Sequence, residues 1–211
     1  MPQAETAMVI KPTALVIGIG PVGRHVIRVL VESNATSHIR VVDSTPPSLQ
    51  FLSKNCADAI AQCEFLQVNL SSATSLDKIF SRKMHSVDDG NFDWVFNCTP
   101  GLVKMGQSDF VYEKHVYERS MMFAHEAAKR HVPVFVHFGS AWELAGDGTE
   151  ESALLPFSPR TLYSAKLDMD LRNVSQLNLV LVRASATYGP GDFGVMCIAM
   201  AQVFLIFSFQ M

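Results

Sequence analysis

The chain has 211 residues, of which 48% are hydrophobic and 18% are charged. This composition predicts a folded protein with a large core and excludes a disordered one, and the length suits one large domain better than two. The formal net charge of −3 and the lack of any run of lysine and arginine argue against nucleic acid as a partner.

The cysteines and histidines show no pattern of a metal site. Cys56, Cys63, Cys98 and Cys197 form no CxxC pair, and the seven histidines have no spacing typical of metal ligands. We therefore predict reduced thiols, no bound metal and a cytoplasmic location. Residues 1–12, read as an N-terminal tail, lack the apolar run of a signal peptide.

A glycine-rich turn follows the first apolar segment, residues 14–17, and leads into a helical pattern. In the run Gly18-Ile-Gly-Pro-Val-Gly23, the first glycine allows a tight turn and the second lets the backbone approach a pyrophosphate. The third lets the helix lie close to the strand. The positive end of a helix stabilises an anion. The sequence therefore predicts a dinucleotide site at Gly18, Gly20, Pro21, Val22 and Gly23.

A second apolar segment, residues 39–42, ends in Asp43, twenty residues after Gly23. A carboxylate there accepts hydrogen bonds from the adenosine ribose of NAD and repels the 2′-phosphate of NADP. Asp43 therefore predicts NAD as the cofactor. Arg24 and Arg40 lie close by and keep NADP as the alternative, and an ordinary strand-to-helix turn with an unrelated aspartate is the structural alternative.

Further strand-like segments follow at residues 64–68, 94–97, 132–138 and 177–182, with helical patterns between them. This alternation predicts an α/β fold with a doubly wound parallel sheet, and the glycine motif selects the strand order 3-2-1-4-5-6. Asp43, Asn69, Asn97 with Thr99, and Ser140 fall at or just after strand ends. They should therefore face one crevice.

Two helical faces are predicted by periodicity. One buried face consists of Val22, Val26, Val29 and Leu30, and another consists of Val116, Ser120, Ala124 and Ala127. On the second helix, the charged side chains are expected to face water; these are Arg119, Glu126, Lys129 and Arg130.

Together these motifs resemble the extended short-chain dehydrogenase/reductase family, of the NAD-dependent epimerase/dehydratase type and its 3β-hydroxysteroid-dehydrogenase-like relatives. The matching motifs also include Asn69-Leu70, Asn97-Cys-Thr-Pro100, His137-Phe-Gly-Ser140 and Arg183-Ala-Ser-Ala-Thr-Tyr-Gly-Pro-Gly-Asp192. The resemblance implies a Rossmann domain over residues 13–192.

The resemblance also implies roles for single residues. Asn69 and Leu70 would lie beside the adenine, although relatives usually carry Asp in place of Asn69, and Asn97 and Thr99 would line the cofactor. Ser140 would hold the substrate oxygen, Lys166 the nicotinamide ribose, and Tyr163 would act as acid and base. Family members often pair through two helices, one of which would be the region 112–129. A homodimer is therefore a further expectation by analogy.

The sequence departs from the family at two places. The catalytic Tyr and Lys of relatives are four residues apart, whereas Tyr163 and Lys166 are three apart, which puts Leu162 at the position of the Tyr. Moving by one residue along a helix rotates the side chain by about 100° around the axis. Only an irregular helix would therefore bring Tyr163 and Lys166 onto the same face. Relatives also carry a substantial C-terminal substrate portion, of which residues 193–211 would be an apolar remnant. Those residues carry no charge and approach membrane-spanning length, so a membrane anchor is the alternative that the interrupting polar residues disfavour.

Three functional readings remain open. The first is an NAD-dependent oxidoreductase or epimerase/dehydratase that acts on a small molecule, either a sugar nucleotide or a sterol-like alcohol. The second is a nucleotide-binding regulator with weak or no turnover, which Leu162 favours. The third is an inactive, truncated fragment.

Overall fold

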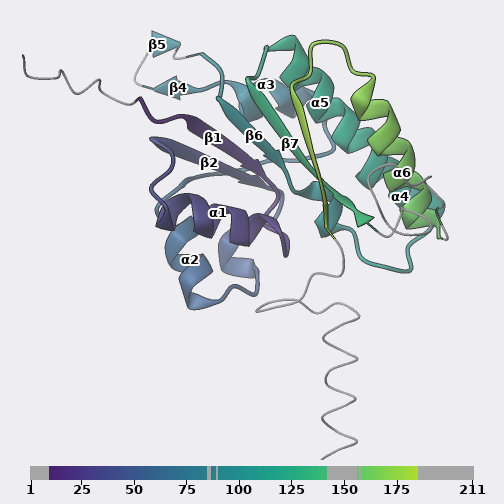
Figure 1. Cartoon of the computed structure of the whole chain (residues 1–211). Helices are drawn as coiled ribbons and strands as arrows, with labels where there is room; N and C mark the ends of the chain where they lie inside the picture. Colours follow the sequence, from purple (N-terminus) through teal and green to yellow (C-terminus); the bar gives the residue numbers. More distant parts are fainter. Residues whose placement is uncertain (1–9, 85–86, 89, 142–155, 157, 185–211) are drawn as a thin grey trace, which may run out of the picture.

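The computed structural model describes residues 10–84, 87–88, 90–141, 156 and 158–184. A six-stranded parallel sheet with the order β3-β2-β1-β6-β7-β8 forms its centre (Figure 1). Its strands are β1 (Thr13–Ile17), β2 (His38–Asp43), β3 (Glu64–Gln67), β6 (Trp94–Asn97), β7 (Val134–Ser140) and β8 (Leu179–Ala184). Strands β4 and β5 lie outside this sheet. When the six strands of the sheet are numbered in chain order without them, their spatial order is 3-2-1-4-5-6, which confirms the predicted fold class.

Helices cover both faces of the sheet, as parallel strands require. In Figure 1, one face carries α1 (Gly23–Glu32) and α2 (Lys54–Ile60), and the other carries α3 (Leu76–Phe80), α4 (Asp109–Tyr112), α5 (Arg119–Lys129) and α6 (Pro159–Arg172). Two clusters of buried apolar side chains correspond to these two layers. Four short helical segments complete the connections: η1 (Pro47–Leu49), η2 (Ala73–Ser75), η3 (Thr99–Leu102) and η4 (Glu113–Glu118).

A two-stranded hairpin, β4 (Lys83–Met84) with β5 (Val87–Asp88), was not predicted. It is too short to show the alternation by which strands are recognised in a sequence.

The helical periodicity was right for one helix and partly wrong for the other. All four residues of the face Val116, Ser120, Ala124 and Ala127 are buried. On α1, Leu30 is buried as predicted, but Val29 is 55% exposed, and Gly23 and Ile27 belong to the buried face. Gly23 carries no side chain, so hydrophobic periodicity could not identify it as part of that face.

Three of the four charged residues predicted to face water do not do so: Glu126, Arg119 and Arg130, whose side chain is only 19% exposed. Glu126 is buried and accepts a hydrogen bond from Arg130 Nε, and Lys129 lies 3.8 Å from the same carboxylate. Arg119 is half-buried. Burial of a charge requires partners, and the partners of Glu126 lie on its own helix, whereas those of Arg119 include the loop that follows β3.

Candidate functional site

The glycine turn has the geometry that its sequence predicts. Gly18 has a φ of +98°, and its N–H donates to Val42 O at 2.8 Å, so the turn begins directly at the end of β1. A Cβ on Gly23 would lie 1.8 Å from Gly18 O, and one on Gly20 would lie 2.9 Å from the Leu102 side chain. Glycine is therefore required at Gly18 by conformation and at Gly23 by close packing against backbone, whereas a side chain at Gly20 would meet only the end of the Leu102 side chain.

Asp43 ties this turn to the end of β2. Its carboxylate is buried, and Oδ2 accepts a hydrogen bond from the Ile19 N–H at 2.7 Å. Oδ1 accepts another from the Thr45 N–H at 2.9 Å and a longer one from the Ser44 hydroxyl at 3.5 Å. A carboxylate offers about four lone-pair positions, so these three donors leave capacity for a ribose hydroxyl. The predicted ribose acceptor therefore also holds the glycine turn in place.

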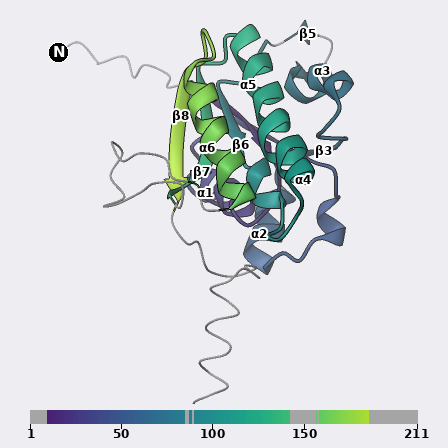
Figure 2. The same cartoon turned by 90° about the vertical axis from the view of Figure 1, so that its right-hand side faces the viewer.

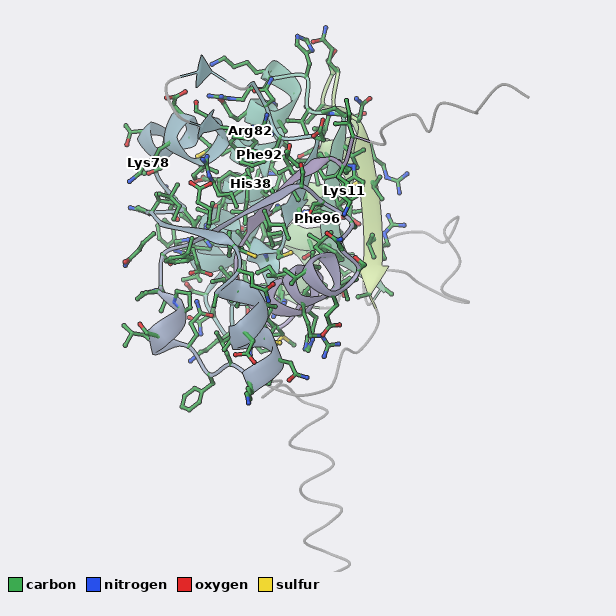
Figure 3. The ribbon with its side chains drawn as sticks, turned by 90° about the vertical axis from the view of Figure 1, so that its left-hand side faces the viewer. Lys11, His38, Lys78, Arg82, Phe92 and Phe96 are labelled. Atoms are coloured by element: carbon green, nitrogen blue, oxygen red, sulfur yellow. The ribbon has the colours of Figure 1, made fainter. Side chains whose placement is uncertain are left out.

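Arg24 and Arg40, the two residues that left NADP as the alternative cofactor, are both hydrogen-bonded to other groups of the protein. Arg40 Nε donates to Glu64 at 3.0 Å, its Nη1 donates to Ser81 O at 2.6 Å, and the guanidinium lies 5.1 Å from the Phe92 ring centroid. Phe92 also stacks against His38, and Figure 3 shows the two rings beside each other. His38 begins β2, so Arg40 is engaged near the start of the sheet's strands rather than at their carboxyl ends.

Arg24 is engaged at the glycine turn itself. Its Nε donates to Gly20 O at 3.2 Å, and its Nη1 donates to Phe51 O at 2.7 Å. The guanidinium is buried and fixes the segment after β2 against the start of α1. These carbonyl contacts give it a structural task beside the turn.

A buried polar network lies where β6 and β7 end. Asn97 Oδ1 accepts hydrogen bonds from the Thr99 N–H and hydroxyl at 3.2 and 2.7 Å, and its Nδ2 donates to His137 Nδ1 at 3.2 Å. Burial lowers the pKa of His137 to about 4, so its ring is neutral at pH 7. Asn97 and Thr99 thus sit together as predicted, whereas the role of His137 was missed. The register partner of Asn97 in β7 is His137, which a sequence reveals only once the strands are aligned.

Asn69, Leu70 and Ser140 follow or end other strands of the sheet. Asn69 is exposed after β3, and its Oδ1 accepts the Ser71 N–H at 3.0 Å, while Leu70 is buried. Ser140 is the last residue of β7 and pairs in register with Ala184 of β8. Because all these strands are parallel, these residues and Asp43 share one edge of the sheet.

Helix α6 presents Leu162 and Lys166 on the same exposed face, because they are four residues apart. Tyr163 instead packs against the apolar core beneath the helix. Between Pro159 and Arg172 the helix is a regular α-helix, so no bulge brings Tyr163 onto the face of Lys166. The π-helical stretch of this region is η4, in the neighbouring helix.

The electrostatic surroundings of Tyr163 oppose an acid/base role. Its partial burial and then the carboxylates of Glu113 and Asp109 raise the pKa of the phenol. Lys166 Nζ lies 4.1 Å from the ring centroid of Tyr117, whose hydroxyl donates to Asp170 Oδ2 at 2.7 Å. That hydrogen bond, together with burial, raises the pKa of Tyr117 to about 12. In the described residues, no hydrogen bond joins a tyrosine hydroxyl to Lys166.

A buried ion pair that the sequence analysis missed connects α6 to β8, which lie side by side in Figure 2. Arg183 Nε donates to Asp168 Oδ2 at 3.0 Å, and the Asp168 side chain is fully buried. Gly139 lies against it, since a Cβ there would be 3.0 Å from Asp168 Oδ1. Arg183 opens the predicted run that ends at Asp192, and residues 185–192 of that run lie outside the described part of the chain.

A cavity of about 680 Å³ lies between α5 and the end of α6 with the segment that follows it, and its lining includes Met121, His125 and Asp170. It contains none of the residues predicted to bind a cofactor or substrate. Among the described residues, no group of three or more His, Cys, Asp or Glu side chains is placed to hold a metal. No helix in that part of the chain is long and apolar enough to cross a membrane, and residues 193–211 lie outside it.

Solved structures share this fold. The chain superposes on the dTDP-glucose 4,6-dehydratase of Bacillus anthracis in complex with NAD (TM-score 0.67, 17% identity, covering 92% of this chain and 61% of that one). It also resembles the UDP-glucuronic acid 4-epimerase of Bacillus cereus in complex with NAD (TM-score 0.61, 16% identity, covering 85% of this chain and 58% of that one). A third similar structure is the UDP-glucose 4-epimerase of Thermotoga maritima with UDP-glucose (TM-score 0.61, 19% identity, covering 86% of this chain and 59% of that one).

The chain therefore spans about 60% of the length of these three structures. A search of the curated proteins found no match. The model of the family described as "NAD dependent epimerase/dehydratase family" matches residues 14–202, which is most of the sequence. The chain belongs to the NAD-dependent epimerase/dehydratase family.

Proposed function

We propose that this chain binds NAD across the turn Gly18–Gly23, with the diphosphate on the backbone at the start of α1 and the adenosine ribose on Asp43. The observation that carries this proposal is the hydrogen bond between Asp43 Oδ2 and the Ile19 N–H. It couples the ribose acceptor to the phosphate-binding turn, so the two parts of the site are held in a fixed relation. A Cβ at Gly23 would collide with Gly18 O of the turn itself, so α1 can begin this close to the turn only because Gly23 has no side chain.

The remaining site residues extend the proposal along the same edge of the sheet. Asn69 and Leu70 would flank the adenine, Asn97 and Thr99 would line the cofactor, and Ser140 would hold a substrate oxygen. Bound NAD supplies hydride transfer. The substrate that we propose is a sugar nucleotide, because the similar solved structures are dehydratases and epimerases named for such substrates; a sterol-like alcohol is the alternative from the sequence.

Titration of the purified full chain with NADH and NADPH tests the proposal. We expect NADH to bind more tightly, and we expect Asp43→Ala to weaken NADH binding by about 10-fold or more, since a charge-assisted hydrogen bond is lost. Asp58→Ala, which removes a carboxylate from α2, is the matched control. Failure of the unmodified chain to bind either nucleotide would refute the proposal.

Weak turnover is the second candidate, and one observation favours it. Leu162, rather than Tyr163, shares the exposed face of Lys166, so the phenol that should exchange a proton is on another face of α6. A misplaced catalytic group costs about a hundredfold in rate. We therefore expect Leu162→Tyr to raise the oxidation or epimerisation rate on a panel of sugar nucleotides and hydroxysteroids. Met169→Tyr, at another exposed position of α6, should leave the rate unchanged. An equal rate in Leu162→Tyr and the unmodified chain would contradict this reading of the helix.

A further inference from the structure

Arg119 makes contacts that connect α5 to the loop after β3. Its Nε and Nη2 donate to Ser71 Oγ at 3.3 and 2.9 Å, and Nη2 also donates to His115 Nδ1. Ser71 follows Asn69, the residue expected beside the adenine, by two positions. The side chain predicted to face water is therefore held at the carboxyl edge of the sheet, beside the adenosine end of the proposed site.

Both hydrogen-bond acceptors of Arg119 are neutral. Ser71 is a hydroxyl, and His115 can accept at Nδ1 only while that nitrogen carries no proton. Burial, followed by the charges of Arg119 and Lys114, lowers the pKa of His115, which keeps it in this accepting form. Among the described residues, no carboxylate forms an ion pair with Arg119, although other arginines such as Arg130 have one.

The acidic group that acts on Arg119 is the one assigned to the ribose. Burial lowers the pKa of the Arg119 guanidinium, and the carboxylate of Asp43 opposes that change. Asp43 itself accepts the N–H groups of Ile19 and Thr45. A partly desolvated guanidinium without a directly bound anion is costly to keep. This one lies against the loop after β3 and feels the charge of Asp43 at the end of β2, and an anionic ligand there would offset the cost.

We propose that Arg119 is a specificity-determining residue that contacts the adenosine 5′-phosphate half of the dinucleotide. This inference rests on the proposed function. A guanidinium suits that moiety in two ways, because it donates to phosphate oxygens and stacks on the face of a purine. Ser71 and His115 are positioning residues that fix the plane of the guanidinium before the ligand arrives.

Calorimetric titration of the full chain with NAD, ADP-ribose and nicotinamide mononucleotide tests the assignment. In Arg119→Gln, we expect the Kd for NAD and ADP-ribose to rise by about 10-fold or more, as for the loss of a hydrogen bond to a charged group. The affinity for nicotinamide mononucleotide should not change. Lys129→Gln is the matched control, because Lys129 also lies on α5, and its side chain is 77% exposed. It should change the Kd for ADP-ribose by less than about twofold.

A spectroscopic measurement on the unmodified chain separates ligand contact from a structural role. We expect ADP-ribose to shift the NMR resonances of the His115 ring and to raise its pKa, because a bound phosphate offsets the neighbouring cations. If Arg119→Gln does not fold, Arg119→Lys takes its place, and it should bind ADP-ribose with an intermediate affinity.

The outcomes distinguish the two proposals. Tight binding of NAD by the unmodified chain, with unchanged affinity in Arg119→Gln, would overturn the role of Arg119 and leave the proposed function standing. Weaker binding in the variant without any response of His115 to ADP-ribose would also overturn it, since Arg119 would then act only on the structure. An unmodified chain that binds neither NAD nor ADP-ribose would refute both proposals.

Discussion

Replacing Gly23 by alanine tests the packing that places α1 against β1. A Cβ at this position would lie 1.8 Å from Gly18 O and 3.0 Å from Gly18 C. The optimal separation between non-bonded heavy atoms is about 3.5 Å or more. The start of α1 and the glycine turn would therefore have to separate by more than an ångström. Overpacking of this kind costs about 1–3 kcal/mol, and here the atom that must move is backbone.

Two measurements follow this change. We expect Gly23→Ala to lower the free energy of unfolding in urea by about 2 kcal/mol or more, and to weaken NADH binding because the amides that face the diphosphate are displaced. Gly101→Ala is the matched control, since a Cβ there has no heavy atom within 4 Å. Equal stability and equal NADH affinity in the two variants would refute the argument that the third glycine is required for close packing.

Two further predictions concern buried polar groups. Asp168→Asn removes the charge that faces Arg183 at 3.0 Å, and we expect it to lower the free energy of unfolding by about 3–5 kcal/mol. By contrast, Glu32→Gln, at an exposed pair with Arg28, should change the free energy of unfolding by less than about 0.5 kcal/mol. If urea unfolding shows equal losses of stability in the two variants, the buried pair is no more important than the exposed one. The second prediction concerns His137, whose pKa is lowered from 6.5 to about 4. The unfolded chain takes up this proton first, so stability should be complete above pH 6.5 and fall by about 3 kcal/mol as the pH drops towards 4. In His137→Gln, the free energy of unfolding should depend less steeply on pH over that range. An unchanged slope would show that other groups cause the pH dependence.

The sequence alone was sufficient for the strand order and for the conformation of the glycine turn. Strands are recognised from short apolar runs, and the spacing of Gly18, Gly20 and Gly23 reflects constraints within a single strand-turn-helix unit. The same local character explains why Asp43 could be identified, because it directly follows an apolar run. Leu162 likewise takes its place on the Lys166 face from helical spacing alone.

Residues whose role depends on a distant partner could not be assigned in this way. The pairing of Arg183 with Asp168 and of His137 with Asn97 exists only because β8 packs beside α6 and β7 pairs with β6. Arg119 was expected in water, and only the approach of the loop after β3 half-buries it. Periodicity shows which side of a helix is apolar, but the elements that cover that side decide which charged groups lose their water. Local sequence thus determined the backbone frame of the proposed nucleotide site, and only the tertiary structure decided which polar side chains surround it.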